Sequence, residues 1–277
     1  MVRARELTST QNPMVKLMRS LYTRKGRDKT GLVPVEGIRF VNEALLAAQR
    51  GVTAIEALFY EAGFDEKGPE QRALIEAAGA AASQVFCCPP ALFRALTDTE
   101  SPQGVAAAVT RPAFPPREAS GRELYLVIDR VQDPGNLGTM VRTAAAAGVH
   151  GVLCLKGTAD PFNSKALRAT MGAVFRIPIS FYDSTQHLLE KLSPWGCRLI
   201  AADVEGPQYH FQADYSGCVA IVVGNEGQGI DPRLLSAATD RVRIPLAGDV
   251  ESLNAAVACG IMLYEAVRFR HMGAECK

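Results

Sequence analysis

The sequence predicts an α/β protein in which a smaller α/β domain precedes a larger domain built on a parallel sheet. Three observations support this prediction. Short, almost wholly apolar runs recur in the second half of the chain, helical stretches or loops separate these runs, and a proline-rich stretch divides the two halves. Strands of a parallel sheet are covered by helices on both faces, so they show this nearly continuous apolar pattern.

Periodicity assigns the individual elements. In the first half we predict helices and strands by apolar spacing, with helices over 36–49 and 72–82 and strands over 54–60 and 104–110. In the second half the apolar runs predict strands over 124–128, 151–155, 174–179, 198–202 and 219–223. The last predicted element is a helix over 253–270, with apolar residues along one face.

The stretch from Arg111 to Gly121 contains three prolines and no periodicity, which is typical of a linker. We therefore predict a first domain over 1–110, a linker over 111–121 and a second domain over 122–277.

Charge is unevenly distributed along the chain, although the formal net charge is only +1. Residues 1–30 contain eight basic and two acidic side chains, a local excess of six positive charges. Such a run is either the solvated surface of a helix or an arm that binds phosphate groups. The sequence leaves both interpretations open.

Several function classes are disfavoured by the composition. The seven cysteines form no C-x-x-C pair and the four histidines stand alone, so we expect neither a metal site nor a disulfide framework. The cysteines fit small core residues in a reducing compartment. No apolar leader segment is visible at the N-terminus and no apolar run reaches about 18 residues, so we expect a cytoplasmic protein without a membrane span.

Three loops follow predicted strands or apolar runs, at the position where open α/β sheets bind ligands. They are Asp129–Gly138, Gly224–Gly229 and Ile244–Asn254. Each has an ordinary structural explanation: the first fits a tight turn before a helix, and Ser252 in the third fits the N-cap of the last helix. The second loop lacks the dinucleotide fingerprint and the P-loop ending, which disfavours NAD and nucleoside triphosphates.

Together the three loops are far more specific. Asn136-Leu-Gly-Thr-Met-Val-Arg142, Gly224-Asn-Glu-Gly-Gln-Gly229, and Ile244-Pro-Leu with Ser252-Leu-Asn254 resemble motifs 1, 2 and 3 of the SpoU/TrmH branch of the SPOUT methyltransferases. This resemblance covers residues 122–270. A weaker one covers 5–110, where Leu7–Pro13 and Val35–Arg39 resemble the L30e-like RNA-binding domain of the family's ribosomal RNA members.

The resemblance implies a trefoil knot, a homodimer with the knot region at its interface, and S-adenosylmethionine as cofactor. It implies no metal. The cofactor would bind at the second and third motif loops, where the expected cofactor-binding residues are Gly224, Gly227, Ile244, Leu246 and Leu253. Glycines let a ligand approach the backbone closely, and the apolar side chains suit the faces of an adenine.

The implied reaction is 2′-O-methylation of a ribose in RNA, because only RNA carries the 2′-hydroxyl. Arg142 matches the motif 1 arginine, and we expect it to hold phosphate and stabilise the developing alkoxide, since guanidinium is effectively never deprotonated. Asn136 would orient the substrate or Arg142, and Glu226 would hold an arginine or receive a proton. Ser252 and Asn254 complete the expected catalytic set, and the general base stays unassigned.

The expected substrate is ribosomal RNA, most specifically 23S RNA, with transfer RNA as the alternative. A catalytically silent RNA-binding protein of the same fold is a second alternative, which the intact polar set disfavours. An oxidoreductase or nucleotide-binding α/β enzyme is a third, which the absent fingerprints disfavour.

Overall fold

The structure is a computed structural model of the chain, and it describes residues 4–115 and 120–275. Contacts divide the chain into two compact units. The first unit contains Met1–Phe114 together with Phe162–Arg176, and the second contains Pro115–Pro161 and Ile177–Lys277. Part of the predicted linker, residues 116–119, lies outside the described residues. The domain boundaries proposed from the sequence stay a prediction.

The first unit is a mixed sheet with helices on both faces. Its elements are β1 (Arg5–Glu6), α1 (Pro13–Ser20), α2 (Arg24–Thr30), β2 (Leu32–Glu36), α3 (Ile38–Gln49), β3 (Ile55–Glu61), α4 (Pro69–Ala81), β4 (Ala82–Cys88), α5 (Pro90–Leu96), β5 (Val105–Thr110), α7 (Ser164–Thr170) and the 3-10 turn η1 (Ala173–Phe175). The strand order is β1-β4-β3-β5-β2. β3 pairs parallel with β4 and antiparallel with β5.

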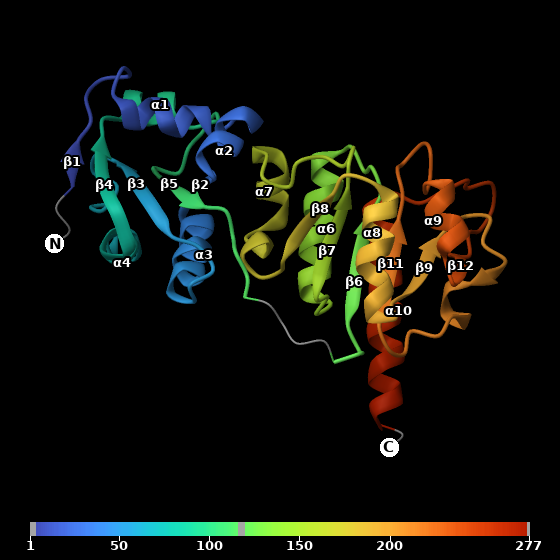
Figure 1. Cartoon of the computed structure of the whole chain (residues 1–277). Coiled ribbons are helices and arrows are strands. Elements are labelled where there is room, and N and C mark those ends of the chain that lie inside the picture. Colours follow the sequence, from blue (N-terminus) through green and yellow to red (C-terminus); the bar gives the residue numbers. More distant parts are fainter. Residues whose placement is uncertain (1–3, 116–119, 276–277) are drawn as a thin grey trace. The chain divides into compact units, whose positions relative to one another are not determined.

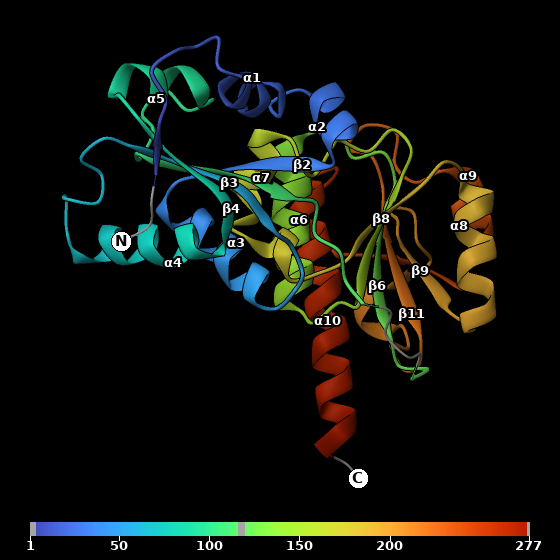
Figure 2. The same ribbon diagram turned by 60° about the vertical axis from the view of Figure 1, so that its left-hand side comes forward.

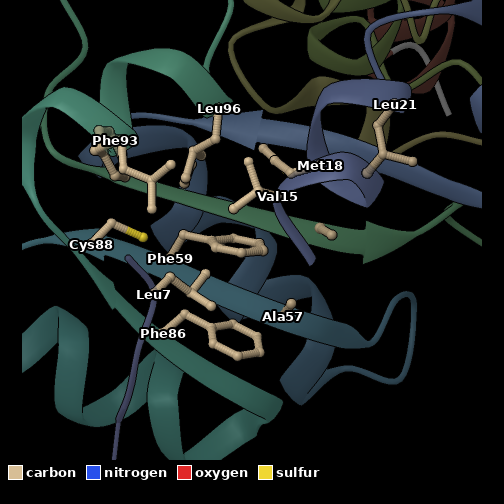
Figure 3. Close-up of a cluster of buried hydrophobic side chains, with 13 residues drawn as sticks. Leu7, Val15, Met18, Leu21, Ala57, Phe59, Phe86, Cys88, Phe93 and Leu96 are labelled. Atoms are coloured by element: carbon tan, nitrogen blue, oxygen red, sulfur yellow. The ribbon is translucent and has the colours of Figure 1, made fainter. Parts of the chain in front are cut away.

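Helices α1 and α5 cover one face of this sheet, and α3 and α4 cover the other (Figure 1; α5 is labelled in Figure 2). Beneath α1 and α5 lies a buried apolar cluster, shown in Figure 3. Phe59 of β3 and Phe86 of β4 stack there, with ring centroids 5.3 Å apart. Met18 of α1 and Phe93 of α5 pack onto this pair and are fully buried. Burial of this apolar surface holds the helices against the sheet.

The basic side chains of the N-terminal segment are of three kinds: buried, paired with a carboxylate, and exposed. Arg27 is only 2% exposed and its Nη1 donates to the Leu21 carbonyl oxygen at 2.7 Å, so this charge is structural. Arg24 and Arg111 both pair with Asp28, at 3.6 and 2.5 Å. The remaining basic side chains of α1 and α2 are exposed: Lys16, Arg19, Lys25 and Lys29.

The second unit is a seven-stranded sheet whose strand pairs are all parallel. Its elements are β6 (Leu124–Ile128), α6 (Pro134–Ala146), β7 (Gly151–Leu155), β8 (Ile179–Tyr182), α8 (Thr185–Leu192), η2 (Ser193–Trp195), β9 (Arg198–Ala202), β10 (Gln208–Tyr209), η3 (His210–Gln212), β11 (Val219–Val223), α9 (Pro232–Ala237), β12 (Asp240–Arg243) and α10 (Ala255–Glu275). The order is β10-β12-β9-β11-β6-β7-β8. Figure 2 shows this sheet with α6 and α10 on one side and α8 and α9 on the other.

The predicted α/β class and the parallel sheet are confirmed, and four of the predicted strands coincide with β6, β7, β9 and β11. The strand predicted over 174–179 is wrong. Met171 and Gly172 have left-handed φ values of 51° and 88°, a 3-10 turn follows, and the strand β8 begins only after Pro178. Val174 and Phe175 are apolar because they are buried, not because they lie in a strand.

No helix in the described part of the chain combines the length and apolar character that a membrane span requires.

Candidate active site

All three predicted motif loops leave the carboxyl edge of the sheet in the second unit. They follow β6, β11 and β12, respectively. β6 and β11 are neighbours, and β12 is separated from β11 only by β9. Because all these strands are parallel, the loops gather at one edge, which is where α/β sheets bind ligands.

A chain of hydrogen bonds joins the three motifs. Asn136 Nδ2 donates to Glu226 Oε1 at 2.9 Å, and Asn254 Nδ2 donates to Asn136 Oδ1 at 3.0 Å. Asn254 lies 118 residues beyond Asn136 in the sequence. The fold therefore brings one predicted catalytic residue from each motif into direct contact.

The two asparagines are fixed by the starts of their helices. Helix α6 begins at Pro134, with the Asp133 carboxylate accepting from the Asn136 backbone N–H at 2.8 Å. Helix α10 is capped by Asn254, whose Oδ1 accepts from the backbone N–H of Ala256 at 2.9 Å. Its amide nitrogen is thereby left to reach Asn136.

The ordinary structural explanation for Ser252, that it is the N-cap of the last helix, is therefore wrong. The helix begins three residues after Ser252, and Asn254 supplies the capping oxygen. Ser252 is exposed and lines the pocket described below.

The second motif is a closed turn. Asn225 and Gly229 exchange two backbone hydrogen bonds of 3.0 Å. Asn225 Oδ1 accepts from the N–H groups of Gly227 and Gln228, each at 2.9 Å. A Cβ at Gly224 would lie 2.5 Å from the Gly229 carbonyl carbon. Gly224 is therefore needed first for the packing of the loop on itself, whereas the sequence suggested room for a ligand.

A buried carboxylate connects the first and second motifs. Asp129 is 1% exposed and accepts from Arg130 Nε at 2.8 Å and from the Asp231 N–H at 2.6 Å. Arg130 has a left-handed φ of 60°, and its carbonyl oxygen accepts from Asn225 Nδ2 at 2.8 Å. Non-glycine residues with such φ values are uncommon and concentrate at functional sites. Asp129, Arg130 and Asn225 thus position the loops around the site.

These three residues were missed as site residues. The available signal was their place directly after strands β6 and β11, where polar side chains face the ligand edge.

A pocket of about 400 Å³ opens between these loops. Its volume lies in the range of about 300–1,000 Å³ that small-molecule sites occupy. All five predicted cofactor-binding residues line it, and the lining also includes Glu226 and Ser252. Ala202, the last residue of β9, lines it too, as do Asp203 and Val204 directly after this strand; these residues were not predicted. The strand over 198–202 was predicted from the sequence, and its carboxyl end was the signal that could have pointed to these residues.

Arg142 lies apart from the hydrogen-bonded chain. It is six residues beyond Asn136 on α6, about 9 Å along the helix axis, and it does not line the pocket. Its side chain is exposed and has no hydrogen bond or ion pair with another described residue. Helical side chains lean toward the N-terminus, so Arg142 leans in the direction of the motif 1 loop.

Comparisons with known proteins identify the family. A family model described as the SpoU rRNA methylase family matches residues 123–264, and one described as the MRM3-like substrate binding domain matches residues 12–107. The chain belongs to the SpoU rRNA methylase family. The resemblance drawn from the three motifs is thereby confirmed.

Similar proteins of this family cover almost the whole chain. An uncharacterized tRNA/rRNA methyltransferase of Synechocystis is 37% identical over 95% of this chain and 93% of its own length. The 23S rRNA (guanosine(2553)-2′-O)-methyltransferase RlmP of Bacillus subtilis is 36% identical over 94% of this chain and 98% of its own. The AdoMet-bound crystal structure of an rRNA methyltransferase from Sinorhizobium meliloti is 34% identical, with a TM-score of 0.80, and the match covers 96% of this chain and 98% of that one.

Proposed function

We propose that this SpoU-family chain transfers the methyl group of S-adenosylmethionine to a ribose 2′-hydroxyl of ribosomal RNA, with 23S RNA as the first candidate. The observation that carries this proposal is the Glu226–Asn136–Asn254 chain, which unites the three motifs beside the pocket. The relatives named for 2′-O-methylation of 23S RNA support the substrate.

The pocket suits S-adenosylmethionine. Ile244, Leu246 and Leu253 offer apolar surface for the adenine, and the Gly224–Gly229 turn offers backbone groups rather than long side chains. Glu226 and Glu251 add carboxylates to the lining, which suit a ligand that carries a positive sulfonium group. When bound, this cofactor supplies an activated methyl group.

Residues of the chain can align the ribose hydroxyl group, accept its proton and bind the neighbouring phosphate. A ribose hydroxyl is a poor nucleophile, so it must be aligned and its proton must leave. Asn136 holds one oxygen of Glu226. The second oxygen has no donor among the described residues, and it is available to a substrate hydroxyl or to an arginine. Arg142 is a free guanidinium that can bind a phosphate bidentately and stabilise the developing alkoxide.

We propose that the chain forms a homodimer through the face of α10 that bears Val257 and Tyr264. Each is 51% exposed, and they lie seven residues, or two helical turns, apart. A trefoil knot is supported by the path of the chain: β12 lies beyond β9, whereas α10 packs on α6, so the chain recrosses the sheet edge between them. We also propose a cytoplasmic location, which is consistent with a ribosomal RNA substrate.

The first unit supplies RNA recognition in this proposal. It presents the exposed basic side chains of α1 and α2, and such groups bind phosphate without reading sequence. The family description of the matching segment as a substrate binding domain supports the same role.

The test is methyl transfer by the purified full chain with labelled S-adenosylmethionine. Ribosomal RNA and transfer RNA are offered separately, and digested products are examined for 2′-O-methylated nucleosides by mass spectrometry. Label in 2′-O-methylated nucleosides of ribosomal RNA is expected. Label in transfer RNA alone would favour the alternative substrate, and binding of RNA without any transfer would favour the silent RNA-binding protein.

A further inference from the structure

A second cavity, of about 380 Å³, is lined wholly by residues of the first unit. Three segments form most of it: the turn from β2 into α3, the loop over 99–103, and helix α7 with Met171. The Val35–Arg39 segment singled out in the sequence supplies the first of these. The proposed methyl transfer uses none of these residues.

The floor of this cavity is rigid and electrostatically satisfied. The Glu36 carboxylate accepts from the Asp98 N–H at 3.0 Å and from the hydroxyls of Tyr22 and Thr99. Burial, with the Glu36 charge beside it, raises the pKa of Tyr22 far above its usual range, so its hydroxyl stays a donor. Because three donors already hold Glu36, its charge is compensated.

The turn into α3 is fixed in the same way. Gln103 Oε1 accepts from the Ile38 N–H at 2.9 Å. Gly37 has a left-handed φ of 91°, and a Cβ there would come within 2.6 Å of the same oxygen. The amide nitrogen of Gln103 remains available as a donor at the cavity.

The walls of this cavity are apolar, and its rim carries two arginines. Phe40, Leu167 and Met171 provide apolar surface, and the Phe40 ring is held by Phe175 at a centroid distance of 5.7 Å. Arg39 of α3 and Arg168 of α7 are exposed lining residues, and neither forms an ion pair with a described side chain. Two unpaired guanidiniums beside an apolar cavity fit a ligand with a flat apolar part and a phosphate.

We propose that this cavity binds one unstacked nucleotide of the RNA substrate, at a recognition site separate from the cofactor pocket. The base would lie against Phe40 and Met171, and Arg39 and Arg168 would hold its phosphate. Proteins recognise single-stranded RNA by taking unstacked bases onto aromatic or apolar side chains. The inference rests on the proposed function, since that function supplies the RNA. A free mononucleotide has the same chemistry and must be separated by experiment.

Two kinds of variant test the cavity in the full-length protein. Arg39→Ala and Arg168→Ala remove the guanidiniums, and Ser101→Trp fills the cavity while it keeps both arginines. Ser101 is an exposed lining residue that makes no hydrogen bond in the described structure. Arg50→Ala is the matched control, because Arg50 is an exposed arginine at the end of α3 outside the lining. Melting temperatures and S-adenosylmethionine affinity should be unchanged in all four variants.

The measurement is filter binding of 23S rRNA across a range of salt concentrations, together with the KM for rRNA in methyl transfer. Each arginine variant should weaken binding and raise KM about 10-fold at unchanged kcat. The slope of log K against log salt should fall by about 0.7–0.9 per arginine. Ser101→Trp should weaken binding about as much without changing the slope, and Arg50→Ala should resemble the wild type.

The outcomes separate the two proposals. If the wild type binds and methylates rRNA, but Arg39→Ala and Ser101→Trp do so equally well, the cavity assignment is overturned and the function stands. If the wild type neither binds nor methylates RNA, both proposals fall. In a calorimetry arm, AMP, GMP, CMP and UMP should bind far more weakly than rRNA. Comparable affinity for any of them in the wild type, lost in Arg39→Ala, would assign the cavity to a free nucleotide instead.

Discussion

Two glycines of one loop offer a matched pair of substitutions. Gly224 and Gly227 both lie in the second motif and both line the cofactor pocket. A Cβ at Gly224 would lie 2.5–2.6 Å from three backbone atoms of Gly229 and Ile230. A Cβ at Gly227 would meet only Asn225 Oδ1, at 3.8 Å, which is ordinary contact. Alanine is therefore expected to be excluded at the first position and accepted at the second.

The expected loss in the free energy of unfolding of Gly224→Ala follows from the backbone atoms that the new Cβ would displace. Backbone atoms cannot yield as a side-chain end would, so Gly224→Ala should break the two 3.0 Å hydrogen bonds between Asn225 and Gly229. Each is worth about 0.5–1.5 kcal/mol net, and the overlap itself costs about 1–3 kcal/mol. A loss of roughly 2–6 kcal/mol in the free energy of unfolding follows from these two terms. Gly227→Ala should change that free energy by no more than about 0.5 kcal/mol.

The assay is denaturant unfolding combined with calorimetric titration of S-adenosylmethionine. Gly224→Ala should lose stability and bind the cofactor at least about tenfold more weakly, because the turn that offers its backbone to the pocket is displaced. If Gly224→Ala matches Gly227→Ala and the wild type in both stability and affinity, the account of this loop is refuted.

Three further predictions concern two residues of the site and two buried cysteines of the same unit. Arg142→Ala should keep cofactor affinity and lose methyl transfer. Arg142→Lys should restore little activity, because the point charge of lysine does not reproduce the guanidinium fork. Near-normal turnover of the lysine variant in a labelled-methyl assay would rule out bidentate phosphate binding. Asn136→Asp should lower turnover by about 10-fold or more, because it replaces the amide donor 2.9 Å from Glu226 Oε1 with a second carboxylate. Turnover equal to wild type would show that the hydrogen-bonded chain is dispensable. Burial raises the pKa of both Cys154 and Cys259 to about 12, so at pH 8 these thiols should stay protonated and resist iodoacetamide until the protein unfolds; peptide mapping that finds them alkylated in the native protein would contradict their burial.

The parallel sheet was predictable because its central strands are covered on both faces. Leu124–Ile128 and Val219–Val223 are apolar throughout and coincide with β6 and β11. Strand β12, the second from the edge of the sheet, gave no such signal, since Asp240–Arg243 is mostly charged. Its Arg241 is held instead by Asp203, at 2.7 Å. A strand at the margin of a sheet needs no apolar run, so periodicity could not find it.

The individual residues of the candidate site could be predicted from the sequence, but the hydrogen bonds between them could not. The motifs named Asn136, Glu226 and Asn254, yet only the structure shows them bonded to one another. The cap of α10 depends on where the backbone turns, so the sequence pointed to Ser252, whereas the structure has Asn254. The role of Arg130 depends on its left-handed φ, and no sequence pattern predicts such a backbone conformation for an arginine.

The most direct test of the central claim is a transcriptome-wide map of 2′-O-methylated riboses in cells with and without this protein. We predict that one ribose methylation of 23S rRNA disappears with the protein, returns with the wild-type chain and does not return with Arg142→Ala. An rRNA methylation map that is identical in the two kinds of cell would contradict the proposed function.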